Sequence, residues 1–332
     1  MVATDAVKAF YNTTFSAVFS ADDTHLVCGN RYGYLTVFNV KRLLRNSLNG
    51  EDDGYLKPAK FVVCKGPIHA VESVGDLLCC GCRNGSVAVY RWKDVIKRKP
   101  KCISVLRSAD MPLNPDCSSE VNALTFDSKK PNFVYAAGGD CVVYNWDLER
   151  SKVVSQWKEH TDYIHCLATS KSGMILSGGE DGRVKCFDGR SPNSVATMQP
   201  YLTSCQRTEL GNWIGCISTY EDWMICGGGA GLGLWYLGTF DLVKSMENNG
   251  MCWSAASLQN EYFLTGDTTG NAYRWSFAGD FLEKMATSCS SIYDITSTKA
   301  EADISVMVCC GSGNAICAYN YFGSKCFKLK SW

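Results

Sequence analysis

The chain has 332 residues, of which 46% are hydrophobic and 20% are charged, and its formal net charge is zero. These values exclude intrinsic disorder and predict a soluble globular protein with a large core. The N-terminal segment has no basic region followed by an apolar one, and no apolar run approaches the ~20 residues that span a bilayer. We therefore expect a protein that is neither secreted nor membrane-spanning.

The sequence contains nineteen cysteines. Most fall in apolar strand-like runs, where a reduced thiol behaves as a small hydrophobic side chain. Cys79 and Cys82 have C-x-x-C spacing, but they lie within a predicted strand, with no second pair or His cluster at zinc-finger distance. We expect reduced cysteines in a nuclear or cytosolic protein, with no metal site and no cofactor.

Residues 1–13 are expected to form a short helical extension, because Ala6, Ala9 and Phe10 recur at helical spacing after Asp5, a candidate N-cap. The chain then repeats one unit: an apolar strand, a second strand ending in a small residue plus glycine, a tight turn, and a strand closed by an aromatic residue. Seven units are present, with anchor glycines Gly29, Gly81, Gly138, Gly178, Gly227, Gly266 and Gly311.

A further strand follows the closing aromatic residue of several units, for example at 153–157 and 242–246. Four strands in each of seven repeats are typical of a seven-bladed WD40-type β-propeller. The sequence therefore predicts an all-β fold that forms one domain over residues 1–332.

The most complete repeat spans Glu159 to Arg190. His160, Ser177 and Asp181 within it are the residue types of a hydrolase triad. No G-x-S-x-G elbow surrounds Ser177, and in WD repeats such residues form a buried hydrogen-bonded network that ties a loop to its own blade. We expect a structural network and no enzyme. Phe187 stands where the pattern favours Trp, so the network should be shorter.

Two long loops, 40–58 and 91–101, are expected side by side on one face, between the third and fourth strands of the first two blades. The second loop carries one acidic residue, Asp94, among its cations, which include Lys93, Lys97, Arg98, Lys99 and Lys101. This patch suits RNA phosphates or an acidic partner. The alternative is a solvated turn whose lysine stems cover apolar side chains.

On the opposite face, loops 107–120 and 199–211 precede the third and fifth blades. They fall near three aromatic residues, Tyr163, Trp213 and Trp253. Exposed aromatic side chains there would suit a protein partner, whereas buried ones would pack between blades.

Several segments are together similar to the THO complex subunit 6 family: EVNAL (120–124), AAGGDC (136–141), HTDYIHCLA (160–168), LSGGEDG (176–182), GNWIGC (211–216) and DWMICGGG (222–229). The resemblance covers essentially the full length. It implies a nuclear, non-enzymatic scaffold of the THO/transcription-export complex that acts in mRNA processing and export. It also implies docking onto coiled-coil subunits and a part in larger assembly. It gives the basic loops little support as an RNA-binding site, so we expect any RNA contact to be indirect.

A different function is suggested by Asp188-Gly189-Arg190, which follows Phe187. Some WD proteins are substrate receptors of cullin-ring ubiquitin ligases and carry Trp-Asp-x-Arg at a blade end, where the arginine engages the ligase adaptor. An arginine after an Asp-Gly turn is also an ordinary solvated turn residue. A ligase-receptor function using Arg190 is thus the alternative to the THO function.

Overall fold

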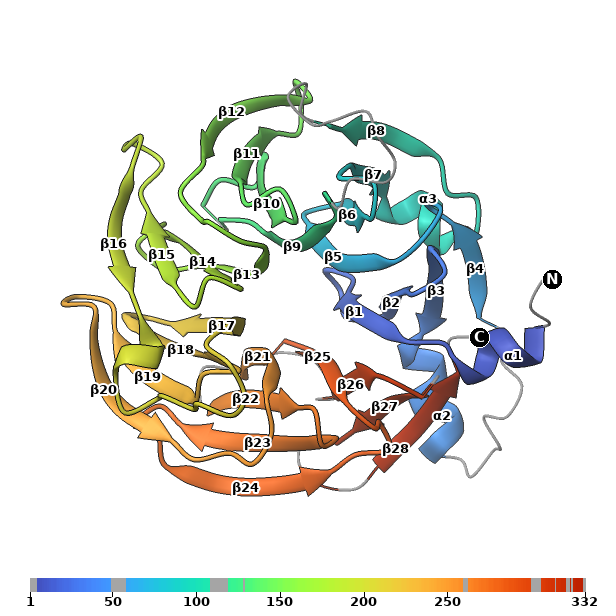
Figure 1. Ribbon diagram of the computed structural model, residues 1–332. Coiled ribbons are helices and arrows are strands. Elements are labelled where there is room, and N and C mark those ends of the chain that lie inside the picture. The colour runs from blue at the N-terminus through green and yellow to red at the C-terminus, as the bar shows by residue number, and fades with distance from the viewer. Residues whose placement is uncertain are drawn as a thin grey trace.

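The computed structural model describes residues 5–48, 58–107, 119–127, 129–258, 262–299, 306–313, 315–320, 323 and 325–330. In these residues the chain forms seven four-stranded antiparallel sheets, arranged as blades around a central channel (Figure 1). The predicted seven-bladed propeller is confirmed. Each blade contains four consecutive strands, and the first strand of each lies nearest the channel.

The strands of the seven blades have the following bounds. Blade one has β1 (Thr14–Phe19), β2 (His25–Asn30), β3 (Tyr34–Asn39) and β4 (Ala59–Val62). Blade two has β5 (Ile68–Val74), β6 (Leu77–Cys82), β7 (Val87–Arg91) and β8 (Cys102–Leu106). Blade three has β9 (Val121–Thr125), β10 (Phe133–Gly138), β11 (Val143–Asp147) and β12 (Lys152–Trp157). Blade four has β13 (Ile164–Thr169), β14 (Ile175–Gly179), β15 (Val184–Phe187) and β16 (Ser194–Met198). Blade five has β17 (Ile214–Tyr220), β18 (Trp223–Gly228), β19 (Leu232–Tyr236) and β20 (Asp241–Met246). Blade six has β21 (Cys252–Leu258), β22 (Tyr262–Asp267), β23 (Asn271–Ser276) and β24 (Phe281–Ala286). Blade seven has β25 (Ile292–Ser297), β26 (Met307–Gly311), β27 (Ala315–Tyr319) and β28 (Lys325–Lys330).

Burial within a blade follows the position of the strand. Second strands are buried along all or nearly all of their length, as β14 is throughout, because neighbouring blades cover both of their faces. This burial explains their continuous apolar runs. Outermost strands such as β16 alternate between half-buried and exposed residues, as expected for a sheet with one solvated face.

The hydrophobic core lies at the seams between blades. Each of seven clusters of buried side chains in the described residues joins two neighbouring blades. In the seam between blades three and four, for example, Val143 and Trp157 pack with Ile164 and Phe187. The propeller is therefore held together by contacts that repeat around the ring.

The first and last blades meet without sharing a strand. The helix α2 (Val40–Leu48) lies in the loop between β3 and β4 and contacts β28. Its buried residues Leu43 and Leu44 pack with Phe327 and Leu329 of blade seven. Part of the predicted loop 40–58 is thus a helix that closes the ring, while residues 49–57 lie outside the described residues.

The expected N-terminal helix is α1 (Asp5–Phe10), and residues 1–4 of the predicted extension lie outside the described residues. The side chain of Phe10 is 76% exposed, and that of Tyr11 is 61% exposed. A helix of six residues is too short to bury a wide apolar face. No helix in the described part of the chain has the length and apolar character needed to cross a membrane.

Five of the predicted anchor glycines occupy one equivalent position. Gly29 on β2 pairs with Ser16 on β1, and Gly178 on β14 pairs with Cys166 on β13. In both blades the partner is the second paired residue of the innermost strand. A Cβ at Gly178 would lie 2.5 Å from the side chain of Ile214 in the next blade, so glycine here permits close packing at the seam. Gly138 and Gly311 stand one residue later in the register, where a Cβ would lie less than 2 Å from a backbone oxygen.

Candidate functional site

Each innermost strand begins with a β-bulge. In blade one, Thr14 pairs with Asn30 and Ser16 with Gly29, which leaves Phe15 as the extra residue. Such a bulge changes the direction of the side chain it carries. The extra residues of the seven blades form what we call the bulge collar: Phe15, His69, Asn122, His165, Gly215, Trp253 and Tyr293.

Five members of the bulge collar carry rings, and these rings lie close together. The ring centroids are 4.7 Å apart for Phe15 and His69 and 5.5 Å apart for Phe15 and Tyr293. They are 6.0 Å apart for Trp253 and Tyr293 and 5.8 Å apart for His165 and Trp253. The mouth of the channel is therefore aromatic around most of its circumference.

The two remaining positions of the collar are filled differently. A Cβ at Gly215 would lie 2.5 Å from the Trp213 ring, so Trp213 occupies the space that a side chain would need. Its ring stacks on Trp253, with centroids 4.5 Å apart and an interplanar angle of 31°. Asn122 donates a hydrogen bond from Nδ2 to the carbonyl oxygen of Ile164 at 3.0 Å, which ties blade three to blade four.

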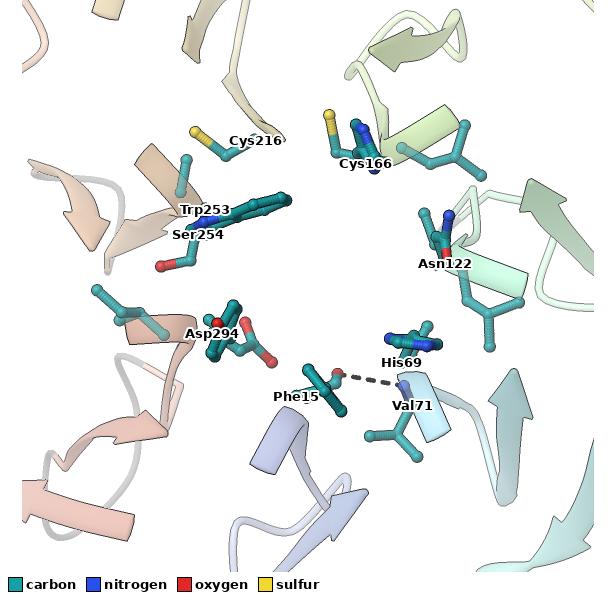
Figure 2. Close-up of a pocket in the computed structure, with 18 of the residues that line it drawn as sticks. Phe15, His69, Val71, Asn122, Cys166, Cys216, Trp253, Ser254 and Asp294 are labelled. Carbon is teal, nitrogen blue, oxygen red and sulfur yellow. Dashed lines mark hydrogen bonds between the residues drawn. The ribbon is translucent and has the colours of Figure 1, made fainter. Parts of the chain in front are cut away.

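The bulge collar separates two parts of the central channel. An outer vestibule of about 270 Å³ is lined by the collar together with Glu120 and Tyr163. An inner channel of about 300 Å³ is lined by the collar and by the residues that follow it along the innermost strands. Figure 2 shows Trp253 extending toward the centre of this channel, while the Asp294 carboxyl lies at the wall and is directed toward blade one.

Two carboxyl groups lie in the wall of the inner channel, Glu72 on β5 and Asp294 on β25. Glu72 accepts a hydrogen bond from its neighbour, the Ser73 backbone N–H, at 3.0 Å, and Asp294 accepts one from the Ala17 backbone N–H at 2.8 Å. Burial raises the pKa of Glu72 to about 7 and the pKa of Asp294 to about 6.

The three aromatic residues singled out from the sequence all lie at this mouth. Tyr163 lines the vestibule and is 37% exposed, while Trp213 and Trp253 are half-buried and stack on each other. Sequence reasoning missed the rings at 15, 69, 165 and 293. The missed signal was their shared position, directly after the buried residue that opens each innermost strand.

The residues expected to form a polar network lie together in blade four. The two ring nitrogens of His160 lie 2.9 Å from Asp181 Oδ2 and 2.6 Å from Ser177 Oγ. Burial raises the pKa of Asp181, but the hydrogen bonds from His160, Thr161 and Arg183 lower it by a larger amount. The pKa of Asp181 therefore lies below its ordinary value. With a proton on Nδ1, His160 donates a hydrogen bond to Asp181, and its Nε2 accepts a hydrogen bond from the Ser177 hydroxyl. Ser177 has no solvent exposure, so a substrate cannot reach its hydroxyl.

Phe187 ends β15 beside this network and contributes no hydrogen bond to it. Its ring packs against Trp157, with centroids 5.2 Å apart. The equivalent residue of blade six is Trp275, whose indole Nε1 donates to Thr265 Oγ1 at 3.0 Å. The network of blade four therefore ends at Ser177.

The basic loop of blade two lies on the face opposite the bulge collar, because it joins a third strand to a fourth. It contains the short helix α3 (Trp92–Ile96), whose Trp92 and Val95 are buried. The five predicted cations, Lys93, Lys97, Arg98, Lys99 and Lys101, are all exposed. Within the described part of the chain, none of them pairs with a carboxylate.

Known proteins resemble this chain over most of its length. The WD domain, G-beta repeat family matches residues 151–188. A THO complex subunit 6 homolog of Danio rerio is 29% identical over 331 residues, covering 97% of this chain and 98% of the relative. A THO complex subunit 6 homolog of Mus musculus is 36% identical over 236 residues, covering 70% of this chain and 67% of the relative. The chain belongs to the THO complex subunit 6 family.

The relatedness extends to plants, where THO complex subunit 6 of Arabidopsis thaliana is 24% identical over 307 residues, covering 85% of this chain and 79% of the relative. In this THO complex subunit 6 family member, the WD repeat match begins one residue before β12 and ends one residue after β15. The repeat as matched in the sequence is therefore offset by one strand from the blade. It includes the polar network, and it ends two residues before Arg190.

Arg190 of this THO complex subunit 6 family chain lies in the turn between β15 and β16. Its side chain is 90% exposed, and its guanidinium pairs with Asp188 Oδ2 at 2.6 Å. A second bond joins Arg190 Nε to Asp188 Oδ1 at 3.0 Å. The side chain is thus accessible, but its charge is already partnered within the turn.

Proposed function

We propose that this chain is a docking subunit of a nuclear THO complex. The observation that carries the proposal is the similarity to THO complex subunit 6 proteins, which covers 97% of the chain and 98% of the Danio rerio relative. A similarity of this extent includes every blade, so it favours a shared set of surfaces as well as a shared fold.

The geometry of the chain supports a function in docking partner proteins without catalysing a reaction. The seven seams make the propeller a rigid platform, and the His160, Ser177 and Asp181 set is directed inward to hold a loop. The half-buried rings at the channel mouth, together with exposed Tyr163, provide the aromatic contacts that partner surfaces favour. We therefore propose a non-catalytic scaffold with the vestibule, including Trp213 and Trp253, as a protein-contacting surface.

We further propose that the scaffold acts in mRNA processing and export, docks onto coiled-coil subunits and promotes larger assembly of THO units. These finer statements rest on the family resemblance. A rigid ring with two accessible faces suits this function, because one face can hold one subunit while the other contacts a second.

The exposed cations of the basic loop are proposed as a contact for an acidic partner surface, with any RNA contact indirect. Their support is the absence of carboxylate partners among the described residues and their location on the face away from the bulge collar. Replacing Lys97, Arg98 and Lys99 by Glu should weaken complex formation in a salt-dependent manner. Loss of direct RNA crosslinks with complex formation unchanged would instead favour RNA as the ligand.

The deciding experiment purifies the tagged full chain from nuclei and maps its neighbours by crosslinking and mass spectrometry. We expect THO subunits to copurify, with crosslinks from coiled-coil subunits to the propeller. A matched pair of variants tests the two faces: Tyr163→Ala at the vestibule and Lys97→Glu in the basic loop. Recovery of the chain without any THO subunit would contradict the proposal.

The alternative, a substrate receptor of a cullin-ring ubiquitin ligase, depends on Arg190. The Arg190→Ala variant is well suited to the same purification, because its exposed side chain packs into no core cluster of the described residues. Copurification of a cullin adaptor that is lost in this variant would favour the alternative. Copurification of THO subunits with both the unmodified chain and the Arg190→Ala variant would favour the THO function.

A further inference from the structure

The central channel combines two kinds of surface, an aromatic mouth and an acidic interior. Its mouth is the bulge collar, whose half-buried rings form a nearly continuous aromatic wall. Below the collar, the inner channel of about 300 Å³ contains the carboxyl groups of Glu72 and Asp294. A ligand for this channel must suit both an aromatic entrance and an acidic interior.

Aromatic rings attract cations, because the ring faces carry negative charge and hold a cation within about 6 Å of the ring centroid. Neighbouring rings around Phe15, Trp253 and Tyr293 have centroids 4.7 to 6.0 Å apart, so they touch one another and present several ring surfaces side by side at the channel mouth. Because these rings are half-buried, a cation that lies against them in the channel would be partly removed from water, which strengthens the attraction.

The acidic groups extend the preference for a cation from the aromatic mouth into the inner channel. Asp294 directly follows the collar residue Tyr293, and Glu72 lies three residues beyond the collar residue His69, which is about 10 Å along an extended strand. No described residue that lines the vestibule or the inner channel is a lysine or arginine. Carboxylates removed from bulk water without a counter-charge are unfavourable, and a bound cation would offset this cost.

The arrangement fits a charged group on a long stem better than a compact ion. The described residues contain no group of three or more His, Cys, Asp or Glu side chains placed to hold a metal ion. The carboxyl groups also lie at different depths below the bulge collar, because Asp294 directly follows its collar residue and Glu72 lies three residues beyond its own. Lysine and arginine match this geometry, because their aliphatic stems favour apolar surroundings while their heads seek charge.

We propose that the central channel binds one lysine or arginine side chain from a basic segment of a partner protein. The stem passes through the bulge collar, and the charged head reaches Asp294 and Glu72. Glu120, in the vestibule wall, adds a negative charge at the entrance that complements the flanking basic residues of such a segment. The inference rests on the proposed docking function for the existence of the partner, while the binding chemistry is a property of this chain.

Direct binding to the full chain tests the proposal, with three capped peptides of sequence Gly-Gly-X-Gly-Gly in which X is arginine, lysine or citrulline. Citrulline has nearly the shape of arginine but no charge. We expect at least one cationic peptide to bind at least tenfold more tightly than the citrulline peptide, as measured by calorimetry. Comparison of the arginine and lysine peptides identifies the preferred head group.

The matched variants remove the charge and keep the hydrogen-bond acceptors. Glu72→Gln combined with Asp294→Asn should weaken cationic peptide binding at least tenfold, and Trp253→Ala should weaken it as well. Glu221→Gln, which removes an exposed carboxylate that pairs with Lys171, should leave binding unchanged. Thermal melting of each variant verifies that it is folded.

Three results would each overturn the proposal: equal binding of the citrulline peptide, unchanged affinity of the folded double variant, or no binding of any of the three peptides. Failure of the proposed THO function has a different signature. In that case THO subunits fail to copurify with the unmodified chain, whereas cationic peptides still bind to the purified protein.

Discussion

Asp294 on β25 accepts a hydrogen bond from the backbone N–H of Ala17 on β1 at 2.8 Å, across 277 positions of sequence. This bond joins the seventh blade to the first at the wall of the central channel. Since no strand is shared between these two blades, the ring closes through this bond and through α2, which packs its leucines against β28. Closure of the propeller therefore depends on contacts between the two blades, which also include a backbone bridge between Thr13 and Ser312, and not on a shared strand.

The closure predicts different effects for two substitutions at Asp294. Asp294→Ala should lower the free energy of unfolding by about 1–3 kcal/mol, because it leaves the Ala17 N–H without its acceptor. Asp294→Asn should lower it less, since the amide oxygen can still accept that bond. Urea unfolding of both variants measures the difference, and equal losses would show that the bond does not contribute to closure.

The buried carboxyl groups predict a pH dependence with a defined sign. Burial raises the pKa of Glu72 from 4.5 to about 7 and that of Asp294 from 3.8 to about 6. The native state therefore holds more protons than the unfolded chain between about pH 4 and 7, and the contribution of these groups to stability falls as pH rises through that interval.

We thus expect the free energy of unfolding of the unmodified chain, relative to the Glu72→Gln, Asp294→Asn variant, to increase by roughly 1–3 kcal/mol from pH 7.5 to pH 5. The comparison cancels the opposite effect of His25 and His69, whose pKa values burial lowers in both proteins. A difference between the two proteins that stays constant with pH would contradict the prediction.

The network of blade four predicts a structural effect at Ser177. This residue is fully buried, and its hydroxyl lies 2.6 Å from His160 Nε2. Ser177→Ala should lower the free energy of unfolding by about 1–3 kcal/mol, because His160 loses a buried partner. Ser191→Ala, at a surface turn, serves as the control and should leave stability unchanged. Normal stability with loss of a hydrolase activity would instead indicate a catalytic serine.

A comparison of blades five and six predicts a stabilising substitution. Trp275 donates to Thr265 in blade six, but the buried Nε1 of the equivalent Trp235 in blade five faces the thiol of Cys226 in place of a hydroxyl group. The residue equivalent to Thr265 is Cys226, and sulfur is a weak acceptor. Cys226→Ser should raise the free energy of unfolding by about 0.5–1.5 kcal/mol, because the hydroxyl oxygen can accept that bond.

Cys226→Ala supplies the control for this substitution, since alanine removes the thiol and provides no acceptor. We expect this variant to be less stable than the unmodified chain in the same urea unfolding measurement. Equal stability of the serine and alanine variants would show that the Trp235 N–H gains nothing from an oxygen at this position.

Much of the fold could be predicted from the residues alone. A unit that repeats along the chain, with a glycine on its second strand and an aromatic residue ending its third, indicates a propeller because each such unit can bury its apolar faces only against neighbouring copies. The polar residues of blade four could be found in the same way. His160, Ser177 and Asp181 occupy fixed positions of the repeat, so their proximity depends on local strand pairing.

The contents of the channel depend on the closed ring. Phe15 and Tyr293 are 278 residues apart in the sequence, and their rings lie near each other only because the first and seventh blades meet. The same closure brings Asp294 against Ala17 and α2 against β28. The repeat alone predicted blades and a local hydrogen-bonded network, since both depend on short-range spacing. The bulge collar, the acidic inner channel and the closing contacts were decided by tertiary structure, because each combines residues from blades that are distant in sequence.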